Sequence, residues 1–237
     1  MVGTIINVAA VIIGGFLGVF FGGKIPERFR HTITAGLGLF TLAYGLQMFF
    51  DTNNALIVLG SLIMGAVVGE LIGIEEGLKH LGVWLESKFQ KNVEDENEQA
   101  RFVKGFMTAS LLFCIGPMAI LGSIQDGLTG DFQTLAVKSV LDGFASLAFA
   151  STLGVGTIFS VLPLFVYQGG ITLLAAQVQS VMSETMMIEM SATGGVILMG
   201  IAISGLLEIK KIRAGSFLPA LVIAPFLVWI LTLIGVI

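Results

Sequence analysis

The chain has 237 residues, of which 55% are hydrophobic and only 12% are charged, and its formal net charge is −4. A mean hydropathy of +0.96 excludes an ordinary water-soluble domain and predicts an integral membrane protein. The charges are spread over the loops without a basic patch, which argues against a nucleic-acid partner. One cysteine, Cys114, excludes an intramolecular disulfide.

Apolar runs of almost twenty residues are long enough to cross a hydrocarbon core of about 30 Å as helices. We therefore predict an all-α, polytopic fold in which residues 1–237 form a single transmembrane domain embedded in the lipid bilayer. Positive residues stay in cytoplasmic loops, and here they fall in alternate loops, so both termini are predicted to be non-cytoplasmic. The eight predicted spans are 3–21, 33–50, 55–74, 102–122, 134–153, 157–176, 191–208 and 216–236.

A further helix is predicted directly after the third span. Apolar residues recur there at helical spacing from Ile74 to Phe89, while charged residues occupy the other positions. This amphipathic pattern predicts a helix at the cytoplasmic interface, followed by an acidic connection from Glu94 to Glu98, within a cytoplasmic segment spanning 75–101.

Two pairs of spans resemble each other and suggest an internal repeat. LIMGAVVGELIGI from Leu62 matches ILMGIAISGLLEI from Ile197, and the fourth and eighth spans share apolar runs that end at Pro117 and Pro225. These matches fit a parallel repeat of four helices plus four, with halves 1–122 and 134–237. Apolar helices also resemble each other by chance, so both interpretations remain open.

The fifth span carries an unusual polar stripe. Lys138, Ser139, Asp142 and Ser146 share one helix face, and a stripe of this width cannot face acyl chains. Two interpretations follow. Lys138 and Asp142 could form a structural ion pair that pins a buried helix, or they could line a solute pathway.

Two helices are predicted to be broken at membrane depth. The breaks are at Gly116–Pro117 in the fourth span and at Gln168–Gly170 in the sixth, and backbone freed there needs protein or a water-filled cavity to satisfy it. Ordinary kinks are the alternative explanation. Asp126 and Asn7 are predicted to complete a vestibule on the outward side. The predicted pathway residues are therefore Asp142, Lys138, Ser139, Ser146, Gln168, Gly116, Pro117, Gly169, Gly170, Asp126 and Asn7.

At these positions the chain resembles a known family. The likeness is carried by SLLFCIGPMAILGSIQDGLTGD from Ser110, KSVLDGFASLAFASTLGVG from Lys138, YQGGITLLA from Tyr167 and the opening GTIINVAAVIIGG. It is a family of small multi-spanning bacterial inner-membrane proteins, domain of unknown function 554, of the YqgA/YdfK type. The resemblance implies a location in the bacterial cytoplasmic membrane and an all-helical fold, and it supplies no substrate or catalytic residue.

We predict a membrane transporter or channel for a small ion or polar solute, with a pathway lined by the fourth to sixth helices and Asp142 as its charge-bearing residue. The alternative is a non-transporting scaffold or regulatory subunit that binds a partner through the interfacial helix. We expect no enzyme, cofactor or metal site, because the chain lacks His-Glu-x-x-His and Gly-x-Ser-x-Gly patterns. Glycine-rich helix faces allow a homo-oligomer as well as packing within one chain.

Overall fold

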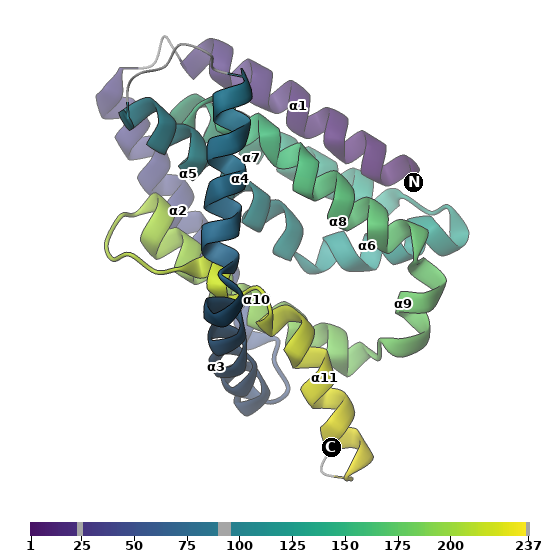
Figure 1. The fold of residues 1–237 in the computed structure, drawn as a ribbon. Coiled ribbons are helices and arrows are strands. Elements are labelled where there is room, and N and C mark those ends of the chain that lie inside the picture. The colour runs from purple at the N-terminus through teal and green to yellow at the C-terminus, as the bar shows by residue number, and fades with distance from the viewer. Residues whose placement is uncertain (23–25, 90–95, 236–237) are drawn as a thin grey trace. The chain divides into compact units, whose positions relative to one another are not determined.

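The computed structural model describes residues 1–22, 26–89 and 96–235, and within these ranges every regular element is a helix. Short 3-10 segments η1 (Val155–Ser160) and η3 (Ala214–Phe217) and a π-helical segment η2 (Ala202–Leu206) accompany the α-helices. The α-helices (Figure 1) are α1 (Val2–Gly22), α2 (Glu27–Phe50), α3 (Ala55–Ile72), α4 (Ile74–Phe89), α5 (Glu96–Ile115), α6 (Pro117–Thr129), α7 (Gln133–Leu153), α8 (Val161–Leu173), α9 (Ala175–Val181), α10 (Glu184–Ile201) and α11 (Ala220–Leu233).

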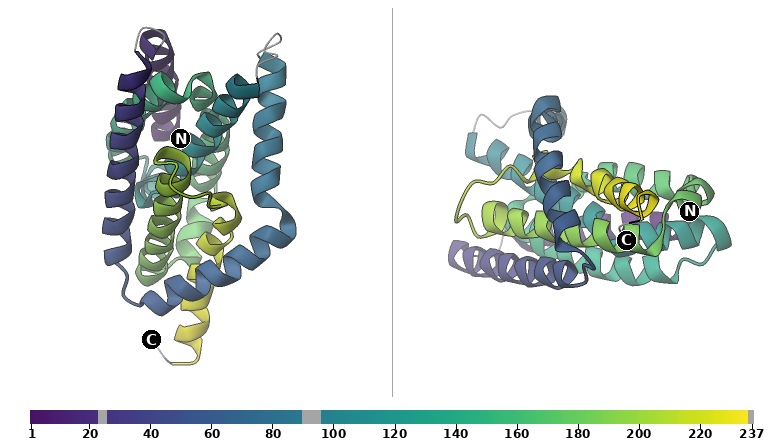
Figure 2. Two further views of the ribbon diagram at one scale, coloured as in Figure 1. Left: turned by 90° about the vertical axis from the view of Figure 1, so that its left-hand side faces the viewer. Right: turned by 90° about the horizontal axis from the view of Figure 1, so that it is seen from below.

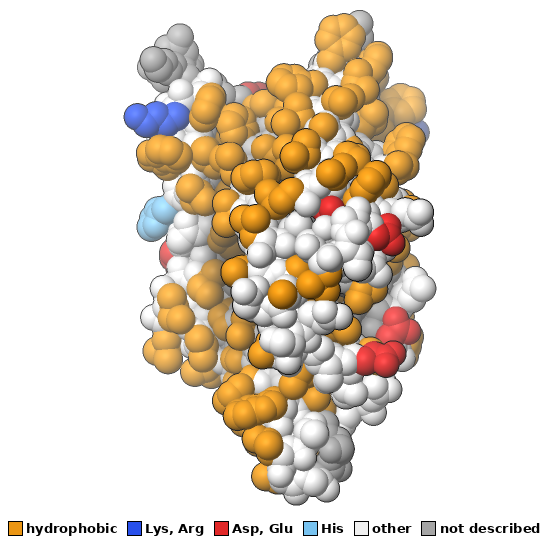
Figure 3. All heavy atoms as spheres, turned by 90° about the vertical axis from the view of Figure 1, so that its right-hand side faces the viewer, with side chains coloured by type: hydrophobic (Ala, Val, Ile, Leu, Met, Phe, Trp, Pro, Cys, Tyr) orange, Lys and Arg blue, Asp and Glu red, His pale blue; other side chains and the backbone are white. Residues whose placement is uncertain are grey.

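The prediction of a polytopic, all-α membrane protein is confirmed. Seven helical segments of the described chain are long and apolar enough to cross a membrane, and α5 and α6 form a further pair bent by 59°. Large apolar side chains are exposed along these segments, including Phe40, Leu56 and Phe144. On the face drawn in Figure 3, hydrophobic side chains crowd together in the upper part, and acidic side chains lie mainly along one edge lower down. Such a surface is suited to lipid and not to water.

The chain divides into two compact units that interleave along the sequence. Unit 1 consists of residues 1–37 and 79–179, and unit 2 of residues 38–78 and 180–237. Each unit draws segments from both of the predicted repeat halves, 1–122 and 134–237. The single domain and the internal repeat therefore stay predictions.

In unit 1, α1 packs closely along α7 because glycines remove the side chains between them (Figure 1). A Cβ atom at Gly14 would overlap the carbonyl oxygen of Gly143, and one at Gly22 would lie 2.7 Å from the carbonyl oxygen of Ser151. The partner numbers rise together along both helices, so α1 and α7 run parallel. Small residues permit this close backbone approach in a lipid environment.

The pair α5–α6 crosses unit 1 once, in the direction opposite to α7. Near the start of α5 the Arg101 Nε donates to the Thr152 carbonyl at the end of α7, over 3.0 Å. In α6, a Cβ atom at Gly122 would contact Leu135 near the start of α7. Since the pair follows α7 from its end to its beginning, it makes one bent span. The predicted break in the fourth span, at Gly116 before Pro117, is confirmed.

The predicted break in the sixth span is wrong. Helix α8 runs without interruption through Gln168, Gly169 and Gly170, and the Gly170 carbonyl accepts a hydrogen bond from the Leu174 N–H at 3.0 Å. Unsatisfied backbone is costly at membrane depth, so a helix keeps its internal bonds unless a neighbour replaces them. The Thr172 hydroxyl also donates to the Gln168 carbonyl within this turn. The irregular part of the span is η1, which precedes α8.

Unit 2 is built on α3, α10 and α11, whose shared core contains Ile57, Met186 and Val228. Helix α3 ends at Gly73, which adopts the left-handed conformation with φ of 72° and turns the chain into α4 (Figure 2). The predicted helix from Ile74 to Phe89 is confirmed as α4. The predicted acidic connection is partly wrong, because α5 already begins at Glu96; residues 94 and 95 lie outside the described part of the chain.

Candidate functional site

The candidate site is centred on Asp142 and Lys138, which lie one turn apart on α7 and form an ion pair. Asp142 is nine residues beyond the start of α7 at Gln133, about 13 Å along a helix that rises 1.5 Å per residue. Only 9% of Asp142 and 5% of Lys138 is exposed. Both charges are thus held close to the middle of an apolar span.

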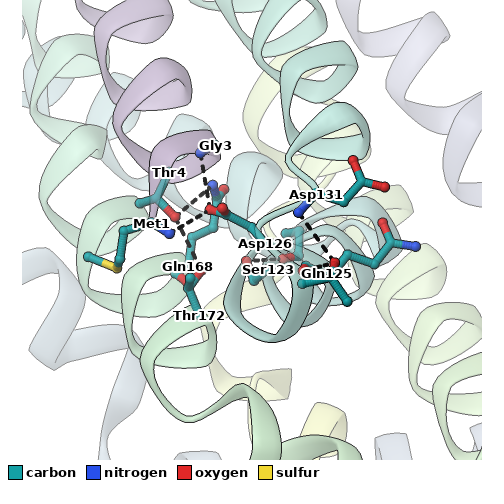
Figure 4. A network of polar contacts seen from close by, with 11 residues as sticks. Met1, Gly3, Thr4, Ser123, Gln125, Asp126, Asp131, Gln168 and Thr172 are labelled. Atoms are coloured by element: carbon teal, nitrogen blue, oxygen red, sulfur yellow. Dashed lines mark hydrogen bonds and ion pairs between the residues drawn. The ribbon is translucent and has the colours of Figure 1, made fainter.

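Asn7 of α1 joins this ion pair to α8. Its Nδ2 donates to Asp142 Oδ2 at 2.9 Å and to Gln168 Oε1 at 3.0 Å. Gln168 Nε2 donates in turn to Thr4 Oγ1, which lies 3.3 Å from Thr172 Oγ1 (Figure 4). We call these residues the polar cluster: Thr4, Asn7, Lys138, Asp142, Gln168 and Thr172. Three helices contribute to it, and both amide side chains are fully buried.

One acceptor in the polar cluster has no partner. Among the described residues, Asn7 Oδ1 is buried and makes no hydrogen bond. The amide cannot be reversed without turning its oxygen toward the Asp142 carboxylate and the Gln168 carbonyl oxygen, which are themselves acceptors. A buried acceptor without a donor is costly. Asn7 Oδ1 can therefore accept a hydrogen bond from one further donor.

Asp126, on α6, has a different set of partners. Its Oδ2 accepts from the Gly3 N–H at 3.0 Å and lies 3.0 Å from the Met1 amino group (Figure 4). These contacts tie α6 to the first turn of α1. Asp126 is only 4% exposed, and the outward vestibule predicted for it and Asn7 stays a prediction, with Asn7 placed inside the polar cluster.

The two serines of the predicted stripe are buried, and their hydroxyls bond to backbone. Ser139 Oγ donates to the Leu135 carbonyl at 2.6 Å, and Ser146 Oγ donates to the Val11 carbonyl of α1 at 2.8 Å. The stripe thus faces the protein interior, as its width requires. Ser146 fastens α7 to α1, and neither serine is bonded to Asp142.

The break between α5 and α6 lies between two helices that both contact α7 and α8, which contribute to the polar cluster. Cys114 is in the last turn of α5 and is partly exposed. The Gly116 carbonyl is bonded to the Ala119 N–H at 3.0 Å. The break therefore contributes a bend of 59° between α5 and α6, and Gly169 and Gly170 contribute regular helix.

The sequence predicted a pathway lined by the fourth, fifth and sixth spans, and it predicted that α1 contributes only Asn7, to the outward vestibule. In the structure α1 supplies Thr4 and Asn7, which link the charged pair to Gln168 and Thr172. Thr4 and Asn7 are three residues apart in an otherwise apolar segment, and this spacing is the feature of the sequence that indicates a polar face on α1. Polar side chains one turn apart share a helix face.

Unit 2 contains a buried carboxylate, Glu189, at a position between the predicted sixth and seventh spans. Glu189 is inside α10 and fully buried. It accepts from the Thr52 hydroxyl at 2.6 Å and from the Asn53 and Asn54 N–H groups at 2.8 and 3.0 Å. These donors satisfy the carboxylate and hold the connection that precedes α3, so Glu189 has a structural position.

A second group of charges surrounds the turn between α3 and α4. Arg213 lies 2.7 Å from Glu70 and also pairs with Glu76. The Gly215 N–H donates to Glu75 at 2.7 Å, and burial raises the pKa of that carboxyl group. No three His, Cys, Asp or Glu side chains in the described chain are placed to hold a metal ion.

These features define a polytopic, all-helical membrane protein with a polar cluster enclosed by α1, α7 and α8. The chain belongs to the family described as "Protein of unknown function (DUF554)", which matches residues 2–229. It is 30% identical over 239 residues to the uncharacterized membrane protein YdfK of Bacillus subtilis (strain 168), covering 99% of both chains. It is also 30% identical over 226 residues to the uncharacterized protein YqgA of Escherichia coli (strain K12), covering 94% of both. No solved structure matches the chain.

Proposed function

We propose that this protein is a transporter or channel for a small ion or polar solute, and that the polar cluster lies on its pathway. The observation that carries the proposal is the connection of the Lys138–Asp142 pair to Asn7 and Gln168 at mid-span. An ionised side chain at the bilayer centre costs about 2.5 to 3.5 kcal/mol on insertion scales. A solute pathway would explain why charged side chains are kept at the bilayer centre despite this cost.

The bend at Gly116 supports the same proposal. Broken helices near the bilayer midplane are where secondary transporters commonly bind their solutes. Here the break separates α5 from α6, and both of these helices contact α7, which carries the two charges. A bend and a charged pair arising independently would be a less economical explanation.

We further propose that the protein lies in the bacterial cytoplasmic membrane, with both termini on the non-cytoplasmic side. The alternation of Lys and Arg between loops supports this orientation. The walls we assign are α1, the α5–α6 pair, α7 and α8. No cofactor, metal or enzymatic step is part of the proposal.

The test is solute and ion entry into proteoliposomes. Swelling in isosmotic small polar solutes and dye-reported entry of H⁺ and K⁺ would be compared between the unmodified protein, Asp142→Asn and Gln168→Ala. We expect a permeability that falls at least tenfold in both variants. Asp131→Asn and Gln133→Ala are matched controls, because both residues are exposed, and they should retain it. Undiminished permeability in Asp142→Asn would contradict the assignment.

A second candidate function is a scaffold that binds a partner through α4. Leu81 and Trp84 are 42% and 54% exposed, which favours contact with a lipid headgroup region or a partner protein. Leu85 is unavailable for this role, because it packs against Phe102 and Phe106 inside unit 1. A scaffold would give no permeability above empty liposomes and would lose partner capture in Leu81→Asn.

A further inference from the structure

The ionised side chains of the polar cluster are balanced. Lys138 and Asp142 carry opposite charges and are paired, while Thr4, Asn7, Gln168 and Thr172 are neutral. A lone cation or a lone anion entering this cluster would leave a net charge buried among apolar helices, which is costly. A solute that carries one charge of each sign would leave the balance unchanged.

The unused bonding groups of the polar cluster are also of two kinds. Asn7 Oδ1 is a buried acceptor that has no donor. The Lys138 ammonium has three N–H groups, and Asp142 is its one described ion-pair partner. The cluster can thus accept from a donor at Asn7 and donate to an acceptor at Lys138. An ammonium group and a carboxylate are the charged forms of this donor and this acceptor.

We propose, on the basis of the transport function above, that the solute is a small zwitterion bearing one ammonium and one carboxylate group. Asp142 and Asn7 Oδ1 receive its ammonium, and Lys138 receives its carboxylate. Binding exchanges the Lys138–Asp142 contact for two contacts with the solute, so no net charge is added to the membrane interior. In the absence of solute the two side chains neutralise each other.

The first experiment compares zwitterions with their singly charged derivatives. The common amino acids with uncharged side chains, their amides (cations) and their N-acetyl derivatives (anions) would be screened by the thermal stability of the purified full chain, because a ligand of the folded state stabilises it. Each compound that binds would then be used as a tracer for uptake into proteoliposomes. We expect at least one amino acid to bind and enter, and its amide and N-acetyl derivatives to bind at least tenfold more weakly.

The second experiment changes the charge balance. Lys138→Met leaves a net negative cluster and should shift preference at least tenfold toward the amide. Asp142→Asn leaves a net positive cluster and should shift preference toward the N-acetyl derivative. Asp131→Asn, at an exposed position, should leave preference unchanged. Each variant would first be shown to be monodisperse, and the comparison on the unmodified protein remains decisive if a variant does not fold.

Three results would overturn the zwitterion proposal. Uptake of amides or N-acetyl derivatives without uptake of any amino acid would exclude this solute class while leaving transport intact. Proton entry alone, abolished in Asp142→Asn, would likewise replace the zwitterion by a proton path. Absence of binding and of every flux would reject the zwitterion together with the transport function.

Discussion

The close packing of α1 on α7 can be tested by adding a single methyl group. Gly14→Ala places a Cβ atom against the Gly143 carbonyl oxygen, whereas Gly36→Ala, in α2, adds one where nothing lies within 4 Å. Both substitutions gain about 1 kcal/mol of helix propensity. Only Gly14→Ala has the overpacking cost, about 1 to 3 kcal/mol. The two variants should therefore differ by about 1 to 3 kcal/mol in free energy of unfolding, or roughly 5- to 150-fold in the unfolding equilibrium constant.

The measurement is equilibrium unfolding in mixed dodecyl maltoside and sodium dodecyl sulfate, followed by circular dichroism. Gly36→Ala should be at least as stable as the unmodified protein, and Gly14→Ala should be less stable than Gly36→Ala. Because α1 carries Asn7, separating α1 from α7 should also weaken the contact between Asn7 and Asp142 and reduce permeability. Equal stability of the two alanine variants would refute the packing argument.

Two further predictions concern unit 2. Glu189→Ala should lower the free energy of unfolding by about 2 to 4 kcal/mol, because the substitution leaves two backbone N–H groups and a hydroxyl without their charged acceptor. The control Glu184→Ala, at an exposed position, should change the free energy of unfolding by less than about 1 kcal/mol. Equal effects of the two substitutions would contradict the buried placement of Glu189. The raised pKa of Glu75 means that the folded state binds its proton more tightly than the unfolded state does, so this residue's contribution to stability should fall as pH rises above 4.5. Glu75→Gln should remove that part of the pH dependence in a melting series from pH 4 to pH 8, and an unchanged series would contradict it.

Much of the fold could be predicted from the chain because the bilayer restricts what a backbone can do. Apolar length predicted the spans, helical spacing predicted α4, and the missing backbone donor of Pro117 predicted the break after Gly116. The polar stripe on α7 was predicted to be buried, and Lys138 and Asp142 are buried and paired. Each of these predictions depends on local chemistry alone.

The remaining features depend on which helices become neighbours. Asn7 is one amide in an apolar run, and only the parallel packing of α1 on α7 brings it to Asp142. Glu189 resembled a loop residue because the donors that allow its burial lie at Asn53 and Asn54, far away in the sequence. Gly169 suggested a broken helix, yet its flexibility is unused because α8 satisfies its own backbone.

The central claim is that the polar cluster opens to water within the membrane, and Cys114 offers the most direct test. It is the chain's one cysteine, it is partly exposed, and it lies at the end of α5, which contacts the helix α7 that carries Lys138 and Asp142. Charged methanethiosulfonate reagents do not enter hydrocarbon, so they should modify Cys114 in intact proteoliposomes only through a water-filled path, with Cys114→Ser as the blank. We predict modification by both the charged reagent and membrane-permeant N-ethylmaleimide. Modification by N-ethylmaleimide alone would contradict the claim and leave Lys138 and Asp142 as a structural ion pair.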